Sequence, residues 1–157
     1  MSEPDLHFMS RAIELGVESV ESGGGPFGAV LVRNGEIIAT GQNRVTETND
    51  PTAHAEVVCV RAACAKLGRF HLEGCELYTS CEPCPMCLAA LYWAHVDRIW
   101  FAAGREDAKA AGFDDDHIYR EMTLSLEARS IPIQRVERAE FARPFEAWSR
   151  HETRREY

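Results

Sequence analysis

Two short segments that lie well apart in the chain constrain its fold most, His54-Ala55-Glu56 and Pro83-Cys84-Pro85-Met86-Cys87. Together they supply one imidazole, two thiols three positions apart and one carboxylate. Thiols at positions i and i+3 share one face of a helix, so both can reach the same metal ion. The chain is therefore expected to fold so that both segments meet at one point.

The expected secondary structure begins with a helix and a hairpin and then alternates strands with helices. Asn34-Gly35 is a strong signal for a two-residue hairpin turn. The expected helices are about 5–22, 51–67, 85–95, 115–126 and 144–155, and the expected strands are about 27–33, 36–40, 76–80, 98–103 and 131–136. This order predicts a single α/β domain over residues 1–157, with a mixed five-stranded sheet that helices cover on both faces.

Composition limits the partners and the compartment. The chain has 17 Lys and Arg against 25 Asp and Glu, a net charge of −8, which argues against a protein that grips a nucleic-acid backbone. No apolar run approaches the ~20 residues of a membrane span, and the N-terminus lacks a secretion signal. Six cysteines in such a chain indicate reduced thiols and a cytoplasmic location. Cys59, Cys64 and Cys75 are expected in the core.

The donor set favours zinc. His54, Cys84 and Cys87 are expected to bind Zn²⁺ and to leave its fourth position open, which lowers the pKa of a bound water to about 7. Glu56, two residues after the imidazole, is then the expected proton carrier. A His-x-Glu segment together with Pro-Cys-x-x-Cys is typical of zinc-dependent deaminases.

Two other metal centres compete with this interpretation. Cys81 lies three residues before Cys84 and could close a structural site with four ligands, but Glu56 would then have no role. An iron–sulfur cluster would need a fourth cysteine where the chain has Leu91.

The two segments resemble the cytidine-deaminase-like superfamily, which includes cytosine, cytidine, guanine and tRNA-adenosine deaminases. Five further stretches resemble the bacterial guanine deaminases of that superfamily: 25–29, 49–56, 78–84, 111–115 and 156–157. The resemblance implies a three-layer α/β/α sandwich. It also implies a homodimer whose C-terminal segments are swapped, so that each closes the active site of the partner.

The same resemblance implies roles for further residues. It places Phe27, Asn43, Ala55 and Trp93 in the pocket for the base, makes Asp115 a second acid near the leaving amino group, and makes Tyr157 part of a lid. Simpler roles remain open. The two aromatic residues could be core residues, Asn43 a turn residue, Asp115 a helix cap and Tyr157 a frayed end.

The expected activity is hydrolytic deamination of free guanine to xanthine and ammonia. Guanine presents adjacent N–H donors, and the acidic run Asp114-Asp115-Asp116 offers acceptors for them. The alternatives are a tRNA-adenosine or cytosine deaminase and, from another class, a catalytically inactive zinc-binding interaction module. The presence of Glu56 counts against the inactive module.

Overall fold

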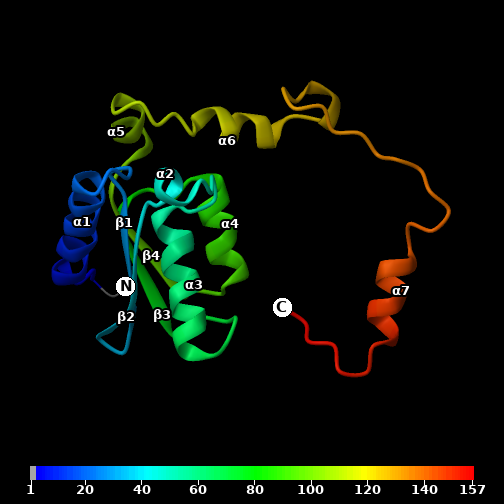
Figure 1. Cartoon of the computed structure of the whole chain (residues 1–157), viewed down its shortest axis with the longest axis horizontal. Coiled ribbons are helices and arrows are strands. Elements are labelled where there is room, and N and C mark those ends of the chain that lie inside the picture. Colours follow the sequence, from blue (N-terminus) through cyan, green and yellow to red (C-terminus); the bar gives the residue numbers. More distant parts are fainter. Residues whose placement is uncertain (1–2) are drawn as a thin grey trace. The chain divides into compact units, whose positions relative to one another are not determined.

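Four strands pair into one mixed sheet in the first of the two compact units, Met1–Asp116 and His117–Tyr157, into which the chain divides. The computed structural model describes residues 3–157. The strands of the described chain are β1 (Gly28–Arg33), β2 (Glu36–Gln42), β3 (Cys75–Cys81) and β4 (Arg98–Ala103), in the spatial order β2-β1-β3-β4 (Figure 1). β1 is antiparallel to β2 and β3, and β3 is parallel to β4.

The hairpin between β1 and β2 turns where the sequence predicts. Asn34 has φ 53° and Gly35 has φ 77°, the two left-handed conformations that a two-residue type I′ turn requires. The register that the turn sets pairs Arg33 with Glu36, and a shift of one residue between Leu31 and Val32 then places Gln42 opposite Gly28. The hairpin prediction is confirmed.

Alternate residues of each strand belong to different apolar clusters, because successive side chains point to opposite faces of a sheet. Ala29 and Leu31 pack in the cluster of α3 (Ala55–Leu67) and α4 (Pro85–Trp93). Val30 and Val32 pack with α1 (Leu6–Glu21) on the other face. Figure 1 shows α1 on one side of the sheet and α3 on the other. The α/β class with a mixed sheet is confirmed.

The N-terminal part of α3 lies directly on the backbone of β2. A Cβ atom at Gly41 would meet the carbonyl oxygen of Ala55 and would come within 2.6 Å of the backbone nitrogen of Cys59. Only glycine leaves room for this approach. The start of α3 is therefore located by backbone contact with the sheet.

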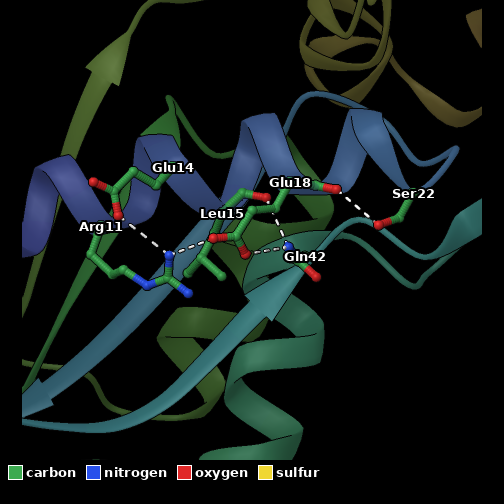
Figure 2. A network of polar contacts seen from close by, with 6 residues as sticks. All are labelled: Arg11, Glu14, Leu15, Glu18, Ser22 and Gln42. Atoms are coloured by element: carbon green, nitrogen blue, oxygen red, sulfur yellow. Dashed lines mark hydrogen bonds and ion pairs between the residues drawn. The ribbon is translucent and has the colours of Figure 1, made fainter.

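Polar contacts fasten α1 to the end of β2 (Figure 2). Gln42 Nε2 donates to the carbonyl oxygen of Leu15 at 3.1 Å and to Glu18 Oε2 at 3.2 Å. The other oxygen of Glu18 accepts from Arg11 at 2.7 Å. These bonds fix the position of the end of β2 along α1, and with it the position of the next residue, Asn43.

Some helix boundaries differ from expectation. α3 begins at Ala55 and not at 51, because the Asp50 carboxylate accepts hydrogen bonds from the backbone N–H and hydroxyl of Thr52, at 2.8 and 2.7 Å. These bonds form a turn before the helix. The short helices α2 (Val45–Thr48) and α5 (Arg105–Ala110) are not predicted, since so few residues show no periodicity. No helix of the described chain is long and apolar enough to cross a membrane.

The second unit contains α6 (Asp116–Thr123, which starts at the unit boundary), the 3-10 turn η1 (Leu126–Ala128) and α7 (Arg143–Arg150). The strand expected at 131–136 is not formed, so a five-stranded sheet is not confirmed. Pro132 has no N–H for a ladder, and Ile131 and Val136 are 74% and 76% exposed. The apolar residues do alternate there, but no strand among residues 3–157 pairs with this segment.

Candidate active site

Two helix starts position the predicted metal ligands. His54 is the N-cap of α3 and Cys84 is the N-cap of α4, both with extended backbone, and neither side chain makes a capping hydrogen bond. The two side chains are therefore available to a ligand. Pro85 occupies the first turn of α4, where its missing N–H costs nothing, and Cys87 follows on the same turn. His54 thus lies just before its helix and not in its first turn.

The three ligand atoms form a nearly equilateral triangle. His54 Nδ1 lies 3.6 Å from the sulfur of Cys84 and 3.5 Å from that of Cys87, and the sulfurs are 3.5 Å apart. Bond lengths of about 2.3 Å to sulfur and 2.1 Å to nitrogen give tetrahedral edges of about 3.6–3.8 Å. The residues present therefore fit zinc. They are the one such group of His, Cys, Asp and Glu side chains in the described residues.

A hydrogen bond links the two thiols. The pKa of Cys84 is lowered because the Cys87 thiol donates a hydrogen bond to its sulfur, and His54 adds a further stabilising contact. The pKa of Cys87 is raised through the same bond and through burial. The pKa of His54 is raised, mainly by its contact with Cys84. A cation bound between these three atoms would take the place of the shared proton and stabilise both thiolates.

Cys81 does not belong to this group. Its thiol points to the carbonyl oxygen of Gly104 at 3.8 Å, and burial raises its pKa to about 11. It lies at the end of β3, before the turn into α4, and lines the same cavity as His54. The ligand atoms that lie within 4.8 Å of one another come from His54, Cys84 and Cys87, and the sulfur of Cys81 is not among them. The geometry favours three protein ligands and an open fourth position.

Glu56 is almost completely buried, with 5% of its surface exposed. Its Oε1 accepts a hydrogen bond of 3.0 Å from the hydroxyl of Thr79. Burial raises the pKa of the Glu56 carboxyl, although hydrogen bonds from its own backbone, from Cys87 and from Thr79 oppose the shift. A carboxyl group whose charged form is disfavoured in this way takes up a proton more readily than an exposed one.

A cavity of about 380 Å³ opens beside these residues, within the size range of small-molecule sites. Its lining includes His54, Cys84, Glu56, Phe27, Asn43 and Asp115. Phe27 meets Phe113 edge to face, with ring centroids 4.9 Å apart, which gives the cavity an apolar wall. The sequence does not predict Phe113, although the stretch 111–115 contains it.

Asn43 offers the cavity a defined hydrogen-bonding group. Its Oδ1 accepts from the backbone N–H groups of Gly25 and Val45, at 3.4 and 3.3 Å. Because both partners are donors, the oxygen must face them, and the NH₂ group is what remains for a ligand. The buried hydroxyl of Ser19 also donates to the backbone carbonyl of Asn43 at 3.2 Å.

Asp115 is the second carboxyl group that lines the cavity. Its pKa is raised, first by burial and then by the charge of Cys84. Glu82, which sequence reasoning missed, lines the cavity as well and forms an ion pair of 3.3 Å with Arg105. Asp115 lines the same cavity as His54 and Cys84, and its role as a second acid near the leaving amino group stays a prediction.

Three predicted pocket residues stand elsewhere. Ala55 is completely buried at the first position of α3 and does not line the cavity. Trp93 ends α4, is 63% exposed and is not part of the lining. Tyr157 belongs to the second unit and is 71% exposed. Roles in substrate binding stay predictions for all three.

Comparison with known proteins supports the same chemistry. A family model described as the cytidine and deoxycytidylate deaminase zinc-binding region matches residues 2–103. Guanine deaminase of Bacillus subtilis (strain 168) is 53% identical over 151 residues, which cover 96% of this chain and 97% of that protein. The tRNA-specific adenosine deaminase of Aquifex aeolicus is 42% identical over 97 residues, 62% of this chain and 64% of that protein.

Solved structures give a matching result. The X-ray structure of guanine deaminase from Bacillus subtilis has a TM-score of 0.96 and 51% identity, and the match covers 99% of both chains. Guanine deaminase from Nitrosomonas europaea has a TM-score of 0.68 and 35% identity, with 73% of this chain and 67% of that chain covered.

The triangle of ligand atoms predicts the effect of two cysteine substitutions. Cys84→Ser should lose most of its zinc, because one of three ligands becomes a poor one. Cys81→Ser should keep one zinc per chain, since the Cys81 thiol already has the Gly104 carbonyl as partner. Elemental analysis of the purified variants measures both. Zinc loss in Cys81→Ser would contradict an open three-ligand site.

Proposed function

The chain belongs to the cytidine and deoxycytidylate deaminase zinc-binding family, and we propose that within this family it hydrolyses free guanine to xanthine and ammonia. One observation carries the substrate. The similarity to a guanine deaminase extends over almost the whole of both chains, whereas that to the Aquifex aeolicus tRNA-specific enzyme covers about two thirds of each. The net charge of −8 also suits a small neutral base better than tRNA.

His54, Cys84 and Cys87 would hold the zinc. Bound there, the ion lowers the pKa of a water in its open position to about 7 and so supplies a nucleophile at neutral pH. Two thiolates balance its charge of two, which leaves the protein site neutral overall. Cys87 is buried and the other two ligands are half-buried, so water and substrate could reach the ion only from the side of the cavity.

Glu56 carries the protons. It takes one proton from the attacking water as the oxygen bonds to carbon 2 of guanine, and it delivers that proton to the adjacent ring nitrogen. Carbon 2 is then tetrahedral, with one hydroxyl and one amino group. Glu56 next moves the hydroxyl proton to the amino group, so that the carbon–nitrogen bond breaks, ammonia leaves and the carbonyl of xanthine forms. A positioned acid–base group of this kind typically contributes about 10²–10⁴-fold in rate.

The cavity supplies contacts for a purine. The wall of Phe27 and Phe113 suits the face of a flat ring, and the NH₂ group of Asn43 suits an acceptor at its edge. Asp115 can accept from the N–H donors of guanine and assist the departing amino group. Trp93 and Tyr157 would complete the pocket after a subunit or lid movement, and Ala55 would support it from its buried position at the start of α3.

The functional unit we propose is a homodimer with exchanged C-terminal segments. No residue of 117–157 is buried, and the large apolar side chains of Ile131, Val136, Phe141 and Phe145 are each more than 60% exposed. So much exposed apolar surface favours association. In this dimer, residues 131–136 would form the expected fifth strand by pairing with the edge strand β4 of the partner subunit. This pairing would complete a three-layer sandwich. Tyr157 would then close the partner's cavity.

The compartment we propose is the cytoplasm. All six cysteines are free thiols. Zinc binding needs the thiols of Cys84 and Cys87 reduced, a state that a cytosolic environment maintains.

The proposed substrate predicts a ranking of rates. The purified protein should release ammonia fastest from free guanine, more slowly from cytosine and from adenosine in tRNA. Asp115→Asn should lower kcat/KM for guanine while the fold and zinc content are kept. Ammonia release from a panel of free bases, a nucleoside and tRNA measures the ranking. Faster turnover of tRNA or cytosine would overturn the guanine assignment, and no turnover of any member would point to an inactive binding module.

The role of Glu56 predicts a specific loss. Glu56→Gln keeps the shape of the side chain and removes its ability to carry a proton, so turnover of guanine should fall by roughly 10²-fold or more. Zinc content and the melting temperature should stay close to those of the wild type. Steady-state kinetics with elemental analysis of the same sample decides the point. A variant with zinc and normal turnover would show that another group moves the proton.

The exchanged dimer predicts complementation. Removal of the last few residues should reduce turnover sharply with zinc content unchanged. Co-expression of the truncated chain with Glu56→Gln chains should restore activity, because one site of the mixed dimer then combines an intact Glu56 with the partner's Tyr157. Normal activity of the truncated enzyme would exclude a lid. Inactive truncated enzyme without rescue in mixed dimers would place the lid within the same chain.

A further inference from the structure

Thr79 is a polar residue in an apolar layer. It belongs to β3, where Cys75, Leu77, Thr79 and Cys81 point to the face covered by α3 and α4. Its side chain is completely buried. Burial of a hydroxyl costs free energy unless it is hydrogen-bonded, and valine would fill the same space without that cost. A threonine at this position therefore needs a hydrogen-bond partner for its hydroxyl, and that partner indicates its role.

The hydroxyl of Thr79 has one partner, the Oε1 atom of Glu56 at 3.0 Å. The two residues lie on different elements, β3 and the first turn of α3, so the bond ties the side chain of the helix to the sheet. A hydrogen bond between a hydroxyl and a carboxylate is stronger than one between neutral groups. We propose that Thr79 is a positioning residue, which holds the carboxylate of Glu56 in the orientation that proton transfer needs.

Glu56 has to address two atoms in turn, the oxygen of the attacking water and a nitrogen of the base. A long side chain can rotate its carboxylate about the last bond, since this torsion has broad minima. A bond to Oε1 fixes the plane of the carboxylate and leaves Oε2 at a defined place. Displacement of a reacting group by about 1 Å can cost about 10²-fold in rate. Through the hydroxyl of Thr79, the sheet thus determines the orientation of the Glu56 carboxylate.

The position of Thr79 separates this role from substrate binding. Thr79 does not line the cavity, whereas Glu56 does. A change at Thr79 should therefore alter the rate of the chemical step and leave the binding of the base unchanged. The inference rests on the proposed function, because it needs Glu56 to be the proton carrier.

The test compares Thr79→Val with Thr79→Ser in the full-length zinc enzyme. Thr79→Val keeps the shape and removes the hydroxyl, so kcat should fall about 10–100-fold, the usual cost of losing such a supporting partner, with KM and zinc content unchanged. Thr79→Ser keeps the hydroxyl and removes a buried methyl group. Its kcat should stay within about twofold of the wild type, while its Tm falls by roughly 2–4 °C. The loss of kcat is thus expected in Thr79→Val, and the loss of thermal stability in Thr79→Ser.

A second pair keeps the inference testable if Thr79→Val folds poorly. Thr79→Ala and Thr79→Ser both lack the methyl group and differ in the hydroxyl, so they should have similar Tm values and kcat values that differ by about 10-fold or more. Equal kcat values in this pair, or a wild-type kcat in a folded, zinc-loaded Thr79→Val, would overturn the inference.

Glu56→Gln, measured in the same assay, separates this inference from the proposed function. If Glu56→Gln is inactive and the hydroxyl at position 79 has no effect on kcat, the positioning role alone is wrong. If Glu56→Gln turns over guanine normally, the assigned proton route is wrong and the positioning role falls with it.

Discussion

The approach of two helix N-termini is the constraint on which the rest of the structure depends. α3 and α4 both begin at the metal-binding group, with His54 and Cys84 as their N-caps. The N-terminal ends of two helices carry partial positive charge and repel each other unless anionic groups lie between them. The sulfurs of Cys84 and Cys87 lie at the start of α4, where the partial positive charge of the helix end favours the thiolate over the thiol. The chemistry of the site is thus also what makes its architecture stable.

Much of this arrangement can be predicted from the sequence, and the features that cannot be predicted have identifiable physical reasons. The spacing of His54, Cys84 and Cys87 predicts the metal-binding group that the structure brings together. Asn34-Gly35 predicts the hairpin, since its turn is local. Phe113 and Thr79 are invisible to spacing arguments because their partners, Phe27 and Glu56, are distant in the chain. A strand at 131–136 needs a neighbour, and no local pattern reports whether one is present.

The cavity divides its work between two kinds of contact. In the proposed function, its apolar wall of Phe27 and Phe113 would accept any flat ring and so would contribute affinity with little discrimination. Discrimination falls to the polar groups. Asn43 is held from three sides, by Gly25, Val45 and Ser19, and its amide cannot rotate without the loss of two backbone bonds. A site built from fixed donors and acceptors rejects a wrong base because buried groups would be left unpaired.

Gly41 has a consequence for how the protein can evolve. It lets the start of α3 rest on the backbone of β2, so the spacing between helix and sheet there depends mainly on backbone atoms and on the Cβ atom of Cys59. Apolar side chains in a core can be exchanged for others of similar volume at small cost, and each exchange shifts the packing slightly. The contact between Gly41 and the backbone of α3 passes little of such a shift in packing to His54. The interior of the protein can therefore drift over generations while its metal ligands stay in register.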